Sequence, residues 1–198
     1  EASEIFLGRK QSYPHSVALP FVDNRVDVQQ PFEKAKAAYA KLKTAEEPGV
    51  PLYASIMHKI DRSTYKHKRD DMLLLSSNTL RVFASKTGKL KFELPLNELK
   101  GISVSRFYDG VCVLHTTGRV KGDKGDMIFD TPHVIEFVTM LNRVLETLRK
   151  KVPDFAQVPI AIVDEIGLER SNGKQGMICF KTAEAEKSPY STIKQNNM

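Results

Sequence analysis

The chain has 198 residues, 41% of them hydrophobic, which is enough to build one sizeable folded unit with additions. Lys and Arg number 30 against 24 Asp and Glu, and this net charge of +6 favours anionic partners such as lipid headgroups, nucleic acid or an acidic protein. No apolar run reaches the ~20 residues of a membrane-spanning helix, and the first residues do not follow the order of a signal peptide. We expect a soluble domain, and two distant cysteines, Cys112 and Cys179, favour the cytoplasm.

Residues 1–30 have no steady period and are predicted to form an extended arm laid over the rest of the domain. A short amphipathic helix is predicted next, because Pro31 suits a first helical turn and Pro48-Gly49 would stop the helix. Its apolar stripe consists of Phe32, Ala35, Tyr39 and Leu42. Its exposed lysines are expected to form a solvated face that adds auxiliary attraction for anions; they are Lys34, Lys36, Lys41 and Lys43.

Residues 52–129 change to the pattern of short strands, seven in succession with turn residues and no helix between them. In "KLKFELPL", for example, Leu90, Phe92 and Leu94 are predicted to point inward, and Lys91 outward. Consecutive strands without crossover helices predict an antiparallel, strongly bent sheet or barrel.

A second helix is predicted after these strands, with Thr131 as its cap, Pro132 in its first turn and Pro153 at its end. Its broad apolar face is expected to cover the open end of the barrel and contains Val134, Phe137, Val138, Leu141, Val144, Leu145 and Leu148. Residues 158–181 are predicted to add two strands around a Ser-Asn-Gly turn. The last ~10 residues are too polar to pack, and we interpret the chain as a piece of a longer polypeptide.

The turn between the first two predicted strands, "HKIDRSTYKHKR", is unusually basic. Five cations surround a single acid, Asp61: they are Lys59, Arg62, Lys66, Lys68 and Arg69. Lys and Arg side chains that converge with backbone amides at the mouth of a barrel suit a multiply charged phosphate headgroup. Each cation near an anionic membrane contributes ~1 kcal/mol, so the turn predicts weak, salt-sensitive lipid binding.

Other functions are less favoured by the residues. The five histidines have no metal-ligand spacing, His115 is expected to be a satisfied core or interface side chain, and both cysteines are expected to be small buried apolar residues. The glycine-rich "GRVKGDKGD" at 118–126 is predicted to be a hairpin loop. We therefore expect no catalysis, cofactor or metal. The absence of Trp and of any base-reading motif disfavours nucleic acid.

Seven strands followed by one helix resemble a pleckstrin homology fold, in which the loop between the first two strands carries the basic residues for inositol phosphates. The stretches "FLGRKQSYPHSV", "KIDRSTYKHKRDDMLLLS", "LKGISVSRFYDGVCVLH" and "GDMIFDTPHVIEFVTML" occur in the order and spacing of the tail homology 1 domain of class I myosins. The chain resembles this family over residues 5–180, with 101–115 as the most distinctive part.

The resemblance implies an α+β fold, with a pleckstrin homology-like bent antiparallel barrel capped by a C-terminal helix. The expected parts of this single tail domain are an N-terminal arm and bracing helix (1–49), the core (50–151), a C-terminal strand extension (152–187) and a polar linker (188–198). Within the basic turn, Lys59 matches the basic residue ending the first strand, and Arg69 a basic position in the following stretch. Arg62, Tyr65 and Lys66 match the family's "DR..YK" step.

The implied function is to anchor an actin-based motor to anionic lipids, often phosphatidylinositol 4,5-bisphosphate, at the cytoplasmic face of a plasma or endocytic membrane. Actin and calmodulin-like light chains would bind other parts of the full-length myosin, which would also contain the ATPase. Asp70 and Asp71 depart from the family pattern, which commonly has an Arg two residues before the "LLL" run; an Asp there would repel phosphate and could pair with Arg69 or Lys59. The alternative is therefore a pleckstrin-like module that binds a cargo protein.

Overall fold

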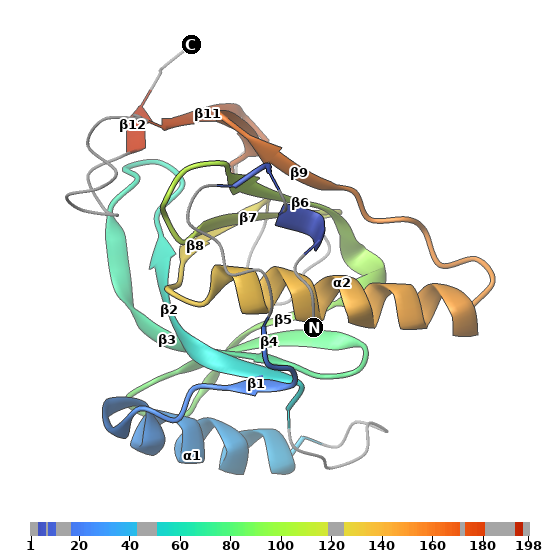
Figure 1. Cartoon of the computed structure of the whole chain (residues 1–198). Helices are drawn as coiled ribbons and strands as arrows, with labels where there is room; N and C mark the ends of the chain where they lie inside the picture. The colour runs from blue at the N-terminus through green and yellow to red at the C-terminus, as the bar shows by residue number, and fades with distance from the viewer. Residues whose placement is uncertain are drawn as a thin grey trace.

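The fold is taken from a computed structural model, which describes residues 4–6, 8–10, 17–42, 51–118, 125–170, 173–180 and 193–195. A bent sheet wraps around one helix, and a second helix lies against the outside of the sheet (Figure 1). Short helical turns η1 (Glu4–Phe6) and η2 (Leu96–Glu98) complete the helical part of the described residues. Neither α1 nor α2, the longer helices described below, is long and apolar enough to cross a membrane.

Seven strands form the body of the sheet in the region where the sequence predicts seven. They are β2 (Tyr53–Ile60), β3 (His67–Leu75), β4 (Thr79–Ala84), β5 (Leu90–Pro95), β6 (Leu99–Ser105), β7 (Val111–Thr116) and β8 (Met127–Asp130). Their order in space is β5-β4-β3-β2-β8-β7-β6, and all of these pairings are antiparallel. This order confirms the predicted strand succession and the bent antiparallel sheet.

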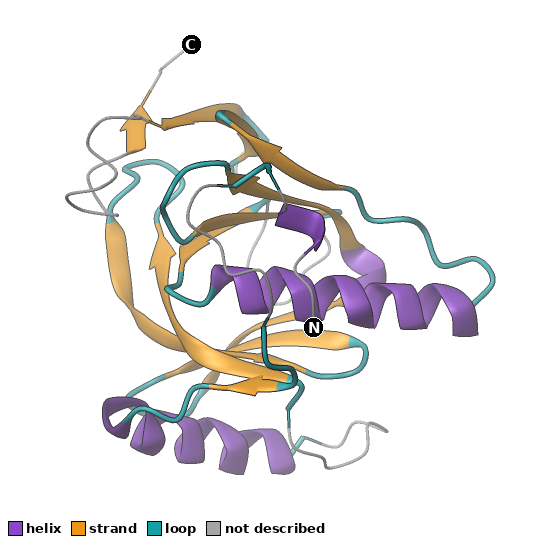
Figure 2. Cartoon of the chain, viewed as in Figure 1, coloured by secondary structure: helices purple, strands orange, loops and turns teal. Residues whose placement is uncertain are grey.

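Strand β2 joins the two halves of the sheet. It pairs with β3 along most of its length, and its last three residues, 58–60, also pair with β8. A register shift between His58 and Ile60 marks an irregularity in the β2–β3 ladder. Such irregularities bend a strand and increase its twist, which lets one strand serve two halves that face each other. The result is the pleckstrin homology-like architecture that the sequence predicts, with strands in orange around the purple α2 in Figure 2.

Helix α2 (Val134–Lys151) fills the inside of this sheet. Its predicted apolar face is confirmed: Phe137, Val138 and Leu141 are fully buried and pack in one core with strands from both halves, including Leu73 and Phe129. The helix begins two residues later than Pro132, the predicted first-turn residue, and it has no side-chain cap. The Thr131 hydroxyl instead accepts the backbone N–H of His133, at 3.3 Å, one step before the helix.

Helix α1 (Val26–Ala40) packs on the outer face of β2, β3 and β4. Its predicted stripe is confirmed, because Ala35 is fully buried and Phe32 packs with it against Met72 and Phe83. The predicted start was wrong: the helix begins at Val26, so Pro31 lies inside it. Proline removes one helical N–H bond, a cost that packing on the sheet can offset. The helix ends at Ala40, and residues 43–50, with Lys43 and the predicted stop, lie outside the described residues.

Segments from both ends of the chain add strands. Near the start, β1 (Phe21–Val22) pairs in parallel with β2. Beyond α2, β9 (Ile160–Val163) pairs in parallel with β6, and β10 (Glu165–Glu169) forms a hairpin with β11 (Gln175–Phe180). The hairpin confirms the predicted strand pair and covers the outer face of β7 and β8. A third partner, β12 (Ile193–Gln195), pairs with β11, where the sequence predicts only a polar linker.

Candidate functional site

The basic turn joins β2 to β3 and is built around Asp61. The Asp61 carboxylate accepts the backbone N–H groups of Ser63 and Thr64 at 2.8 and 2.9 Å, and the Tyr65 N–H donates to the Asp61 carbonyl. These backbone hydrogen bonds, more than the nearby Lys68 ammonium, lower the pKa of Asp61 to about 2. Tyr65 adopts a left-handed conformation with φ of 55° and is buried. The single acid in this basic segment therefore shapes the turn as well as offsetting its charge.

Lys59 lies on the inner face of the sheet at the end of β2. Its register partner is Phe129 of β8, which belongs to the central core, and cross-strand partners share a face of a sheet. The preceding residue, His58, pairs with Asp130 and faces the other side. Lys59 therefore lies on the core-facing side of β2, one residue before the strand ends, and its contact with a headgroup stays a prediction.

The other four predicted residues are in the same hairpin but differ in their surroundings. Arg62 is half-buried and donates to the Asp126 carbonyl at 2.7 Å, which ties the turn to the start of β8. Lys66 is exposed, and Lys68 is exposed with its ammonium 3.2 Å from Asp61. Arg69 is in β3, and its side chain lies outside the described residues. The hairpin therefore brings the five backbones together, while one of the described cations serves as a structural tie.

The two aspartates that depart from the family pattern have partners that the sequence did not identify. Asp70 is exposed and its carboxylate lies 2.6 Å from His58 Nδ1. Asp71 is completely buried and its carboxylate lies 2.7 Å from the Lys91 ammonium. Asp71 pairs in register with Met57 of the central core, so it faces the inside of the sheet, while strand alternation turns Asp70 outward. Only Asp71 therefore faces the same side as Lys59.

Lys91 is a candidate that sequence reasoning missed. The alternating pattern of β5 predicts it to point outward, but a register shift between Val82 and Phe83 breaks the alternation. As a result Leu90, predicted to face inward, packs in the cluster under α1, and Lys91 reaches the buried Asp71. The shift has no local sequence signal such as a glycine, so periodicity alone could not detect it. Lys59, Lys91 and Asp71 thus share the inner face of the sheet, and we call the part of that face that carries them the inner mouth.

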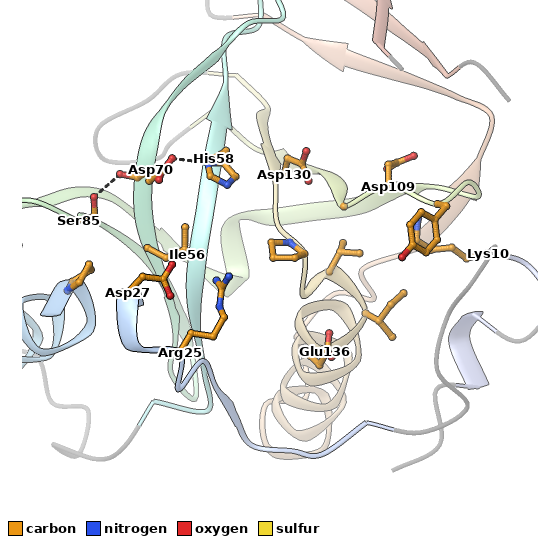
Figure 3. A pocket seen from close by; sticks show the side chains of 16 residues that line it. Lys10, Arg25, Asp27, Ile56, His58, Asp70, Ser85, Asp109, Asp130 and Glu136 are labelled. Atoms are coloured by element: carbon orange, nitrogen blue, oxygen red, sulfur yellow. Dashed lines mark hydrogen bonds and ion pairs between the residues drawn. The ribbon is translucent and has the colours of Figure 1, made fainter. Parts of the chain in front are cut away.

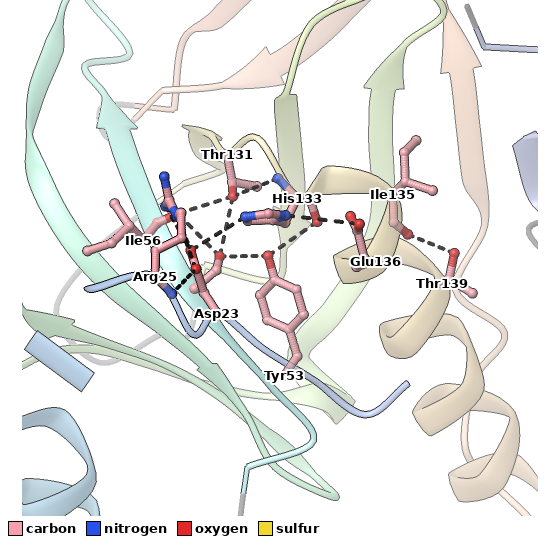
Figure 4. A network of polar contacts seen from close by, with 10 residues as sticks. Asp23, Arg25, Tyr53, Ile56, Thr131, His133, Ile135, Glu136 and Thr139 are labelled. Atoms are coloured by element: carbon pink, nitrogen blue, oxygen red, sulfur yellow. Dashed lines mark hydrogen bonds and ion pairs between the residues drawn. The ribbon is translucent and has the colours of Figure 1, made fainter. Parts of the chain in front are cut away.

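A buried polar network holds the arm, the sheet and the start of α2 in place (Figure 4). The Tyr53 hydroxyl lies 2.7 Å from the Ser55 hydroxyl and donates to the His133 carbonyl at 3.3 Å. His133 in turn lies 3.4 Å from the Asp23 carboxylate, and two nitrogens of the Arg25 guanidinium donate hydrogen bonds to the same carboxylate. Burial acts to raise the pKa of Asp23, but the Arg25 hydrogen bonds outweigh it and lower this pKa overall. The network therefore holds Arg25 close to the N-terminus of α2.

Comparison with known proteins identifies the family. A family model described as "Unconventional myosin tail, actin- and lipid-binding" matches residues 12–197. The chain belongs to this family. Unconventional myosin-Ib of Mus musculus is 31% identical over 91% of the chain, and unconventional myosin-Ia of Bos taurus is 32% identical over 87%. The chain spans about 15% of the length of each of these curated relatives.

Solved structures give a more distant likeness. A Slm1 pleckstrin homology domain in complex with D-myo-inositol-4-phosphate has a TM-score of 0.41 and 15% identity, covering 49% of this chain and 97% of its own. The hSac2 domain of human phosphoinositide phosphatase Sac2 has a TM-score of 0.43 and 16% identity, covering 68% of this chain and 89% of its own. The assignment to the myosin tail family therefore depends on the sequence matches.

The contacts and burial of His115 and of the two cysteines can be compared with the predictions made for them. The His115 ring lies 2.7 Å from the Ser103 hydroxyl and 2.9 Å from the Asp126 carboxylate, which confirms a satisfied side chain.

Cys112 is fully buried as predicted, and burial raises the pKa of its thiol. Cys179 differs from the prediction, because it is only partly buried and its thiol lies 3.5 Å from the Glu165 carboxylate. Of the loop predicted at 118–126, residues 119–124 lie outside the described residues.

Proposed function

We propose that this tail domain anchors an unconventional class I myosin to membranes by binding anionic phospholipids, phosphoinositides in particular, through the β2–β3 turn. The family assignment carries the proposal, since the matching family is described as actin- and lipid-binding. Two features of the geometry support the proposal: Lys59 lies on the inner face of the sheet, and Lys66 and Lys68 are exposed in the turn that follows it. Arg62 and Arg69 complete the proposed site.

Two kinds of contact contribute to this proposal. Lys59 and the newly identified Lys91 lie at the inner mouth, where fixed ammonium groups can distinguish one phosphate arrangement from another. Lys66 and Lys68 lie on the outside of the turn, where attraction depends on total charge and contributes ~1 kcal/mol for each cation. The buried Asp71 opposes phosphate at the inner mouth, and its contact with Lys91 offsets that repulsion. We infer modest affinity with some preference for multiply phosphorylated headgroups.

Vesicle co-sedimentation tests the proposal most directly. The chain is mixed with vesicles that contain either phosphatidylinositol 4,5-bisphosphate or enough phosphatidylserine to give the same total charge. Lys59→Ala should weaken binding to the phosphoinositide vesicles by about tenfold and binding to phosphatidylserine by about fivefold or less. Lys150→Ala removes an exposed lysine at the far end of α2 and is the matched control. No binding of the unaltered chain to either vesicle would contradict the proposal.

We also propose a non-enzymatic role for this part of the myosin, located at the cytoplasmic face of a plasma or endocytic membrane and associated with the actin cytoskeleton. The family match to a tail supports this role, as does the small share of the relatives' length that the chain spans. The ATPase motor and the site for calmodulin-like light chains would lie in the remainder of the polypeptide. Steady ATP turnover by the isolated chain would contradict this division.

Actin is a second candidate partner of the tail itself. The sequence led us to place actin binding in other parts of the full-length myosin, but the family description names actin together with lipid. Co-sedimentation with actin filaments at low and moderate salt tests whether the chain contributes. Filament binding that survives in Lys59→Ala would favour an actin site distinct from the proposed lipid site.

A further inference from the structure

A cleft of about 570 Å³ opens on the outer side of β2, away from the inner mouth of the sheet (Figure 3). Its walls come from the starts of α1 and α2, from β2 and β3, and from the β6–β7 loop. In Figure 3, Asp70, His58, Asp130 and Asp109 follow one another along one side, with Arg25 and Glu136 below them. This volume is within the range of ligand-binding pockets and far exceeds the space that one ion needs.

The cleft is acidic although the chain as a whole has a net charge of +6. Its lining includes five carboxylates, those of Asp27, Asp70, Asp109, Asp130 and Glu136. The lining also contains Lys10 and Arg25, but both are engaged elsewhere. The Lys10 ammonium donates to the backbone carbonyls of Ser105 and Phe107 at 2.8 and 2.6 Å. Arg25 pairs with Asp23, which is not part of the lining.

Asp130 is the carboxylate that most needs a further partner. Its side chain is only 5% exposed, and its Oδ2 atom forms no hydrogen bond within the described residues. The Nε2 atom of His67 lies 3.6 Å from that oxygen, and burial lowers the pKa of this ring, which favours its neutral form. A buried carboxylate without a hydrogen bond carries a substantial desolvation cost. Asp109, by contrast, accepts the Ser105 hydroxyl and the Val111 N–H.

The chemistry of the lining selects the kind of cation. No group of three or more His, Cys, Asp or Glu side chains in the described part of the chain is arranged to hold a metal ion. Tyr108 also lines the cleft and is 56% exposed, which is unusual for a large aromatic side chain. An aromatic face next to carboxylates suits a guanidinium or ammonium group, which can stack on the ring while it pairs with an acid.

We propose that this cleft binds an Arg or Lys side chain from a basic segment of a partner protein, with Asp130 at its floor and Glu136 and Tyr108 beside the entering chain. This goes beyond lipid anchoring, because the outer side of β2 would bind protein while the inner mouth binds lipid. His58 and Lys59, consecutive residues on opposite faces of β2, would separate the two functions.

The test uses the whole chain and a fluorescent peptide of alternating Gly and Arg, with binding followed by anisotropy. Asp130→Asn and Glu136→Gln should each weaken binding, Asp130→Asn by at least about tenfold. Glu146→Gln is the matched control, because Glu146 is exposed on α2 roughly 15 Å along the helix from Glu136. The same peptide with citrulline in place of Arg keeps the shape, removes the charge and should not bind.

Several results would overturn the proposal. They are equal binding of the peptide to the unaltered chain and to Asp130→Asn, equal loss with Glu146→Gln, or equal binding of the citrulline peptide. Binding of spermine or of Ca²⁺ without binding of the Arg peptide would assign the cleft to a free amine or a metal and would also overturn it. Vesicle binding is measured separately on each variant, so failure here is distinguishable from failure of the lipid proposal.

Discussion

At the scale of single residues, Asp61 both shapes the basic turn and reduces its charge, and two substitutions separate these effects. Asp61→Asn keeps an oxygen that can accept the Ser63 and Thr64 N–H groups but removes the charge beside Lys68. It should therefore bind anionic vesicles about fivefold more tightly. Asp61→Ala loses both hydrogen bonds and should lower the free energy of unfolding by about 1 to 2 kcal/mol. Tighter binding by neither variant would argue that this turn does not touch the membrane.

Asp130 should make stability depend on pH in an unusual direction. Burial and the charge of Asp109 raise the pKa of Asp130 to about 6, although His58 and Lys10 act the other way and His67 lies beside it. The folded protein therefore holds this proton at pH values where the unfolded chain has lost it, so stability from Asp130 is fully present below about pH 4 and is lost as the pH rises through about 6.

Asp130→Asn removes this cost. Its free energy of unfolding should exceed that of the unaltered chain at pH 8, by a difference on the order of 2 to 3 kcal/mol, and the difference should shrink toward pH 4. Urea unfolding at both pH values measures it. A variant that is less stable at pH 8 would show that the Asp130 carboxylate makes favourable contacts that outweigh its burial.

At the scale of elements, the contact between α1 and the β4–β5 turn tests whether this helix braces the sheet. Gly88 has φ of +72°, and a Cβ there would lie 2.8 Å from the Lys34 carbonyl of α1. Gly173 has φ of +78° with nothing near its Cβ position, so Gly173→Ala isolates the backbone strain alone. Gly88→Ala should lower the free energy of unfolding by about 2 to 3 kcal/mol, against about 1 kcal/mol for the control. Equal losses of unfolding free energy in the two variants would mean that α1 shifts away from the new methyl group at little cost.

The sequence predicts a helix or strand well where its apolar residues repeat at regular spacing because they all face a single core. The strand succession from β2 to β8 and the apolar face of α2 are such cases, because burial forces a regular spacing of apolar residues. The errors occur where packing overrides a local preference. Pro31 is tolerated inside α1, and the shifted register of β5 turns Leu90 outward and brings Lys91 to Asp71. Such shifts depend on the neighbouring strand, which a single segment does not reveal.

At the scale of the whole molecule, the candidate site could be predicted only in part. The basic turn is contiguous in sequence, so its cations were visible as one cluster. Lys91 is over twenty residues further along, and the outer cleft combines the starts of two helices with the edge of the sheet. These groups meet only because β2 pairs with both β3 and β8. Long-range strand pairing of this kind places Lys59 and Lys91 on one face of the sheet and the acidic side chains of the outer cleft on the other side. A count of charges in the sequence does not reveal this separation.

The salt dependence of vesicle binding tests whether the exposed cations of the turn and the inner mouth contribute differently. Lys66 is exposed, so its attraction to an anionic vesicle acts through water and is screened over roughly 10 Å at 0.1 M salt and roughly 3 Å at 1 M. Lys66→Ala should weaken binding to phosphoinositide vesicles about fivefold at about 0.1 M salt and hardly at all at about 0.5 M. Lys59→Ala should weaken it at both, because a group at the inner mouth would contact the headgroup directly. Losses that vanish together for both variants would instead indicate a diffuse basic surface without a defined headgroup site.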